Sequence, residues 1–209
     1  MINKGNKANE NSNLNSGLTA NASLNTKVIT GKIRLAYANI FIARAMEEGQ
    51  EAKYSLCVLI PKGDKATIDK INSAIENAKI SGVTILGDIT DGDFKTPMRD
   101  GDEERPDQSE YLGHYFINAT SKLKPGIVDK SLKEIVDSTK VYSGCYGRVS
   151  LNFYAFNQGG NKGIGCGLQN LQKLAEGEPL STRATAEEDF EDVDNIDFEE
   201  SDKEEDILS

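Results

Sequence analysis

A cluster of carboxylates in residues 98–111 is the first place where the sequence could support a reaction. The segment reads MRDGDEERPDQSEY, and Asp100, Asp102 and Glu104 alternate along it. Carboxylates in this arrangement can bind Mg²⁺ and so promote phosphodiester cleavage. A calcium-binding loop does not fit, because its last ligand position would be Tyr111 instead of glutamate. A metal-dependent nuclease and a surface loop with internal ion pairs therefore both stay open.

Aromatic and cationic side chains on one strand indicate a second kind of chemistry, the binding of single-stranded nucleic acid. In residues 146–156, YGRVSLNFYAF, one face is apolar and the other carries an arginine, an amide and two aromatic rings. Bases stack on such rings and cations contact phosphates. Alternatively, this face is buried under a helix or a dimer partner. The candidate residues are Arg34, Lys53, Phe116, Lys122, Tyr142, Tyr146, Arg148, Asn152, Tyr154 and Phe156.

Other catalytic and cofactor chemistry finds little support. His114 is the only histidine, so the sequence lacks a Ser-His-Asp or Cys-His constellation and a set of zinc ligands. Cys57, Cys145 and Cys166 are isolated, and we expect them to be reduced and buried. The alternating glycines of GGNKGIGCG predict a strand that a backbone or a flat ligand can approach closely, instead of a phosphate-binding loop. We expect no cofactor and no enzymatic activity.

The elements that must position these side chains are mostly strands. Alternating apolar residues predict strands, and one segment has apolar residues at helical spacing, with Asp64 as its N-cap and Gly82 at its end. Strands that pair locally at both ends of the chain favour a mainly β fold, a small antiparallel barrel or open sheet with one or two inserted helices. The expected strands are 27–42, 52–61, 114–122, 140–156 and 162–174, and the expected helix is 63–82.

The charge of the chain is divided unevenly between its body and its C-terminal end. Residues 187–209 hold 13 acids and one base, a net charge of −12, whereas the whole 209-residue chain has a net charge of −10. Residues 1–186 therefore carry 23 bases against 21 acids, a net charge of +2. Such asymmetry is typical of an interaction tail or of a tail that competes with a polyanion.

Composition also predicts the domain boundaries. Residues 1–26 and 181–209 are polar and lack an apolar period, so we expect both to be disordered around one folded domain, 27–180. No apolar run is long enough to cross a membrane, and the N-terminus lacks the apolar region of a signal peptide. These features predict a cytoplasmic protein without membrane contact.

Four long motifs can be compared with known families, namely MRDGDEERPD at 98–107, YFINATSKLKPGIVD at 115–129, the segment 141–174, and EPLSTRATAEEDF at 178–190. Together they resemble a phage protein family that was once filed as a domain of unknown function and is now associated with single-stranded DNA binding. The resemblance implies an OB-fold that coats single-stranded DNA in phage replication or recombination, inside the bacterial host cell. It also implies an acidic C-terminal tail, although this chain ends in DILS, without a terminal aromatic residue.

From this resemblance and the charge split we expect the tail to have two roles. As a tethered polyanion it competes with DNA for the body, and when displaced it recruits replication or recombination proteins. The apolar residues that would contact those proteins are Phe190, Phe198, Ile207 and Leu208. A homodimer is a possible assembly, and a module that binds proteins but not DNA is a further alternative. The sequence leaves the preference for DNA over RNA open.

Overall fold

Five strands close into a barrel in the computed structural model, which describes residues 24–45, 47–87 and 95–180. Around the ring each strand pairs with the next, and the last pairs with the first. All of these pairs are antiparallel except β5 with β8, which is parallel. The ring runs through β2 (Ile33–Arg44), β3 (Lys53–Pro61), β5 (His114–Ser121), β8 (Asn161–Ala175) and β7 (Tyr146–Gln158).

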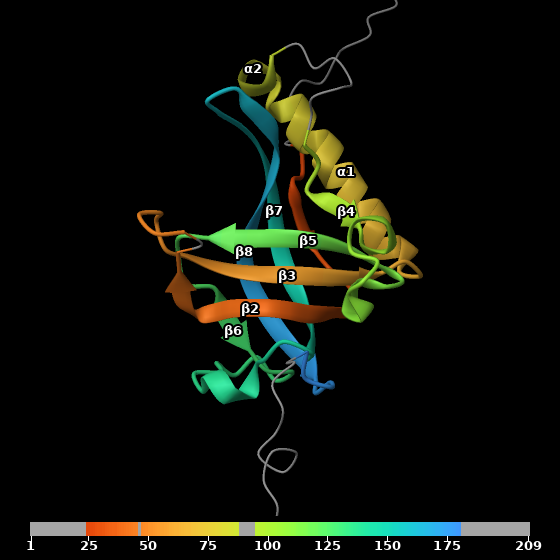
Figure 1. The fold of residues 1–209 in the computed structure, drawn as a ribbon, viewed down its shortest axis with the longest axis vertical. Coiled ribbons are helices and arrows are strands. Elements are labelled where there is room, and N and C mark those ends of the chain that lie inside the picture. Colours follow the sequence, from red (N-terminus) through yellow and green to blue (C-terminus); the bar gives the residue numbers. More distant parts are fainter. Residues whose placement is uncertain (1–23, 46, 88–94, 181–209) are drawn as a thin grey trace, which may run out of the picture.

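The barrel consists of two halves that cross at a steep angle, the meander β2–β3–β5 in front of the long hairpin β7–β8 (Figure 1). Pairing is extensive within each half, but the halves meet at two short seams. One seam is the single pair Thr120 and Gly167, and the other joins the start of β2 to the start of β7. This strand order, with its parallel closing pair, is the architecture of an OB-fold barrel.

The remaining elements extend or cover the barrel. The strand β1 pairs with β7, β4 with the first half of β5, and β6 with β8. The two short segments η1 and η2 are 3₁₀ turns. The elements outside the five-stranded ring are β1 (Lys27–Ile29), β4 (Met98–Asp100), β6 (Gly126–Val128), α1 (Lys65–Ser81), α2 (Val83–Leu86), α3 (Gly101–Glu104), η1 (Ser109–Tyr111) and η2 (Ser138–Lys140). None of the helices in the described part of the chain is long and apolar enough to span a membrane.

The helix α1 forms as predicted and closes the core. The carboxylate of Asp64 accepts the backbone amide of Thr67 at 3.1 Å, which caps the first turn. Ile68, Ile71 and Ile75 recur at helical spacing and are buried in the main core cluster with residues from the barrel strands. Gly82, at the end of α1, packs so closely on β7 that a Cβ there would lie 2.1 Å from the Cβ of Ala155.

The structure corrects two of the predicted strands. The first, 27–42, is interrupted at 30–32 and divides into β1 and β2, which pair with different parts of β7. The strand expected from residue 140 begins only at 146, because the preceding residues form η2 and a turn. All three cysteines are free and buried, as predicted. The predicted terminal segments and the tail residues lie outside the described part, apart from residues 24–26.

Candidate nucleic-acid interface

An open groove of about 520 Å³ crosses the outer face of the β2–β3–β5 half of the barrel. Its floor carries amides and hydroxyls beside apolar groups, because Asn39, Ser55, Asn118 and Thr120 are among the outward-pointing residues of the three strands. The corresponding face of OB-fold barrels, with the loops at its ends, is the usual place for oligonucleotide binding. The main lining residues are Tyr37 and Asn39 from β2, Ser55 from β3, Asn118 and Thr120 from β5, and Arg105 and Tyr111 from the segment after β4.

Tyr154 of β7 borders this groove, on the same outer side of the sheet. Thr120 in the groove pairs with Gly167 of β8, and the next outward residue of β8, Gly165, pairs with Tyr154. The Tyr154 ring lies flat over Gly165, where a Cβ would be 2.8 Å from the ring. The ring is 45% exposed. Of the predicted aromatic strand, Tyr154 is therefore the residue that continues the surface of the groove.

The alternating glycines of β8 have a role that the sequence only partly indicated. Close approach was predicted, but the groups that approach belong to the chain itself. Tyr154 covers Gly165, while Phe156 and the backbone of Lys95 cover Gly163. Phe156 is consequently half-buried, and its ring is less accessible than that of Tyr154.

Two arginines at the groove carry positive charge that no carboxylate of the described residues pairs with. Arg44 and Arg105 line the groove, and neither is in an ion pair with a carboxylate of the described residues. Lys53 pairs with Arg44 across the two strands and is exposed. Lys122, after β5, is exposed but forms an ion pair with Glu51 at 2.6 Å. Tyr37, Arg44 and Arg105 are not predicted as site residues from the sequence, since no local pattern places them together.

A strap formed by residues 176–180 covers another predicted residue, Arg34. The Arg34 guanidinium donates to the carbonyl oxygen of Glu178 at 2.9 Å, and its buried Nε has no hydrogen-bond partner among the described residues. Leu180 donates its amide to Ser143 at 2.8 Å and packs against a small apolar cluster on the outer face. Arg34 therefore lies under the strap in this structure instead of in the open groove.

The first half of β7 carries three predicted residues, Tyr146, Arg148 and Asn152, whose side chains contact other parts of the chain. Tyr146 lies about 26 Å along the strand from Tyr154, at ~3.3 Å per residue. The ammonium group of Lys32 sits 4.3 Å from the Tyr146 ring centroid. Arg148 donates to Gln172 at 2.7 Å, and Asn152 accepts from Thr26 at 3.0 Å.

Tyr142 lies before β7 and outside the predicted strand face. Its hydroxyl is within hydrogen-bonding distance of the Gly177 carbonyl at 2.9 Å and of the Glu176 carboxylate at 3.0 Å. Burial and the Glu176 carboxylate together raise the pKa of the Tyr142 phenol. Tyr142 therefore helps to hold the strap.

The placement of Phe116 corrects the sequence-based assignment. Its side chain points outward from β5, as the alternation predicts, but it is only 1% exposed. Tyr111 packs on it edge to face at 4.9 Å, and the guanidinium of Arg99 lies 4.2 Å from its ring centroid. Together with Ala36, Cys57, Leu59 and Tyr111 it forms the small outer apolar cluster. Phe116 is therefore a packing residue and is not available to a ligand.

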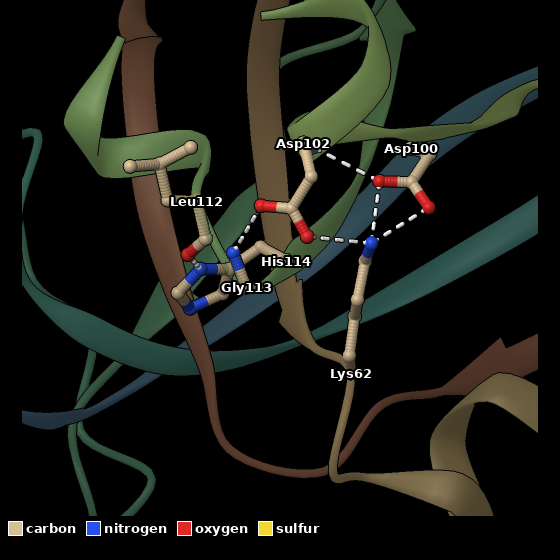
Figure 2. A network of polar contacts seen from close by, with 6 residues as sticks. All are labelled: Lys62, Asp100, Asp102, Leu112, Gly113 and His114. Carbon is tan, nitrogen blue, oxygen red and sulfur yellow. Dashed lines mark hydrogen bonds and ion pairs between the residues drawn. The ribbon is translucent and has the colours of Figure 1, made fainter. Parts of the chain in front are cut away.

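The carboxylates that suggested a metal site already have partners within the chain (Figure 2). The ammonium group of Lys62 contacts Asp100 at 2.6 Å and Asp102 at 2.7 Å. Asp102 also accepts the backbone amide of Gly113 at 2.7 Å. Glu104 pairs with Arg99 at 3.2 Å. Among the described residues no group of three His, Cys, Asp or Glu side chains could hold a metal ion. The network instead anchors the segment that carries Tyr111 over the outer face.

Replacing Lys62 by methionine should raise the pKa of Asp102. The hydrogen bond from Lys62 is the main cause that lowers this pKa, and the Gly113 amide is the second. Because the folded-state pKa is the lower one, the ionised Asp102 stabilises the fold above its unfolded pKa. That contribution is lost as the pH falls through the folded value, and the loss should be smaller in the variant.

Carboxyl-carbon NMR titration of both proteins would measure this change. Asp137 is the internal control, because its pKa is lowered by the hydroxyl and amide of Thr139 and should not move. An Asp102 that titrates at the same pH in both proteins would show that the Gly113 amide alone lowers its pKa.

A closed OB-type barrel with an open groove, flanked by exposed aromatic rings and by arginines without a carboxylate partner among the described residues, is typical of a class of small nucleic-acid-binding modules. Residues 26–208 match the family model described as the ssDNA-binding protein of Enterobacter phage Enc34. The chain belongs to this phage single-stranded DNA-binding protein family. The resemblance inferred from the sequence is thereby confirmed, and the family is one of binding proteins, not of enzymes.

Individual relatives agree with this placement. The putative protein p50 of Acyrthosiphon pisum secondary endosymbiont phage 1 is 26% identical over 184 residues, which cover 83% of this chain and 97% of that protein. The single-stranded DNA-binding protein from bacteriophage Enc34, solved in complex with ssDNA, has a TM-score of 0.68 at 23% identity and covers 75% of this chain and 90% of its own. The gp2.5 protein of bacteriophage T7 has a TM-score of 0.53 at 13% identity, covering 77% and 98%. These likenesses confirm the OB-type fold.

Proposed function

We propose that this protein coats single-stranded DNA without strong sequence preference and serves phage DNA replication or recombination in the host cytoplasm. The observation that carries the proposal is the continuous outer surface from the groove to Tyr154, in a chain of this family. Exposed rings stack on any base, and arginine side chains contact the phosphates that all sequences share. The affinity for single-stranded DNA should therefore depend little on the base sequence of the DNA.

We further propose that the acidic tail competes with DNA for this surface. Support comes from the net charge of −12 over residues 187–209 and from the position at which the described chain ends. Leu180 packs in the cluster that contains Tyr111, and Tyr111 lines the groove. The last described residue therefore lies beside the binding surface, and tethering at this point gives the tail a high effective concentration.

Displacement of the tail by DNA would also free it for other proteins. Its apolar residues among acids, including Phe190, Phe198, Ile207 and Leu208, are the features that a replication or recombination protein would bind. Coating and recruitment are then coupled, because only DNA-bound protein presents a free tail.

Fluorescence anisotropy with labelled single-stranded and duplex oligonucleotides in EDTA tests both proposals. We expect a preference for the single strand, with an affinity that falls with salt by a logarithmic slope of about −0.7 per phosphate neutralised. A chain ending at residue 186 should bind more tightly than the full chain at low salt, because the competing polyanion is gone.

A full-length variant whose tail acids are replaced by their amides separates charge from chain length. It should bind like the truncated chain. Equal affinity of all three proteins would contradict tail competition while leaving DNA binding intact. Absence of single-strand binding by all three proteins would favour a protein-interaction module. Cleavage that appears when EDTA is replaced by Mg²⁺ would restore the nuclease alternative.

A further inference from the structure

The residue Tyr37 is displaced from the regular pattern of its strand by a bulge. On β2 the register with β3 shifts between Ala36, which faces Cys57, and Asn39, which faces Ser55. Three steps on β2 therefore match two on β3, which is the signature of a β-bulge. Tyr37 has a φ of +49°, a left-handed conformation that is costly for a bulky side chain. Backbone strain of this kind is often retained at functional positions.

The bulge turns the Tyr37 ring into the groove and the surrounding residues fix it there. The side chain is 54% exposed, although the alternation of the sequence would bury it. Its hydroxyl donates to Glu110 Oε1 at 3.0 Å. One side of the ring faces Tyr111 with 30° between the planes and 6.4 Å between the centroids. Tyr111 is itself only 6% exposed, so Tyr37 rests on a fixed support.

Charges near the ring complete a site for one nucleotide. Arg44 and Arg105 line the same groove as Tyr37 and lack carboxylate partners among the described residues. A ring held in place loses little entropy when a base stacks on it, and nearby free cations attract the adjoining phosphates.

We propose that Tyr37 is a base-stacking subsite for one unpaired nucleobase, with its ring held by the hydrogen bond to Glu110. This inference rests on the proposed function and names a contact at the opposite end of the groove from Tyr154. It predicts that part of the binding energy depends on the base itself, and is lost when either the ring or the base is removed.

The variant Tyr37→Asn tests the subsite with little disturbance of the backbone, because asparagine tolerates the left-handed conformation. Loss of one stacked base should weaken binding to an oligothymidylate about five- to 150-fold. Ile80→Asn is the matched control, since Ile80 is an exposed side chain of α1 (61%) outside the groove lining. It should bind like the wild type, and thermal unfolding would confirm that both variants fold.

An oligonucleotide of the same length with abasic sites distinguishes stacking from a structural role. On it the difference between wild type and Tyr37→Asn should nearly disappear. An equal loss on both oligonucleotides would mean that Tyr37 only shapes the strand, and no loss on either would exclude it from the site. Both outcomes would overturn this inference and leave the proposed function standing, whereas a wild type that binds no single-stranded DNA would remove both.

Photo-crosslinking of the unmodified protein gives a second readout that does not depend on a variant. An oligonucleotide carrying 5-iodouracil reacts with aromatic side chains that it stacks on, and mass spectrometry locates the adduct. We expect an adduct at Tyr37. Adducts confined to other tyrosines would contradict the subsite even if Tyr37→Asn binds weakly.

Discussion

Replacing Phe116 by alanine should lower the free energy of unfolding by about 3–5 kcal/mol, the usual range for a buried aromatic residue. Its side chain is 1% exposed and supports Tyr111, which packs on it edge to face. The deletion leaves a cavity beneath the segment that carries Tyr111, so the loss combines transfer and cavity contributions. Urea or guanidinium unfolding followed by circular dichroism would measure it.

Phe156→Ala is the matched control for this prediction. It removes the same atoms from a half-buried position on β7, so its effect on unfolding should be clearly smaller. If Phe116→Ala unfolds at the wild-type denaturant concentration while its affinity for single-stranded DNA falls, the sequence-based assignment of Phe116 to the binding surface would be right after all.

Replacing Tyr154 by alanine should reduce the affinity for single-stranded DNA about five- to 150-fold, with little change in stability. A stacked base contributes about 1–3 kcal/mol by alanine substitution. The Tyr154 ring is 45% exposed and lies on the glycine strip that continues the groove. Anisotropy titrations at fixed salt would measure the change, and they should show no comparable effect on the weak binding of duplex DNA.

Tyr154→Phe is the conservative counterpart, because it keeps the ring and removes only the hydroxyl. It should bind nearly as well as the wild type. Wild-type affinity in Tyr154→Ala would place this end of β7 outside the DNA path, and the groove would then have to end at Thr120, where β5 meets β8.

Local periodicity predicted the parts of the fold that depend on neighbouring residues. The cap at Asp64, the apolar stripe of α1 and the alternation of β5 are all properties of short segments, and each was found where the sequence placed it. Tyr37 departs from its pattern because a bulge inserts a residue into β2, and a bulge depends on the partner strand. The alternation of the sequence alone would therefore place Tyr37 on the wrong side of the strand.

The candidate site could be predicted only in part, for a related reason. The alternation places Phe116 and Tyr154 correctly on outward faces, but it does not show what covers each face. Phe116 is covered by Tyr111 from a distant segment, whereas the ring of Tyr154 remains exposed. Arg34 is likewise covered by the strap, which follows it by more than a hundred residues in the sequence. When a segment distant in the sequence covers a strand face, the local periodicity of that strand does not show it.

The two short seams of the barrel make its halves partly independent units. Opening at the pair of Thr120 and Gly167 breaks few hydrogen bonds, whereas separating β7 from β8 breaks many, so local opening should begin at a seam. Tyr37 belongs to one half and Tyr154 to the other. A DNA strand that contacts Tyr37 and Tyr154 would bind both halves of the barrel at once. A ligand that binds only the closed barrel stabilises the closed barrel by mass action. Binding of a DNA strand across both halves would then also stabilise the barrel against local opening.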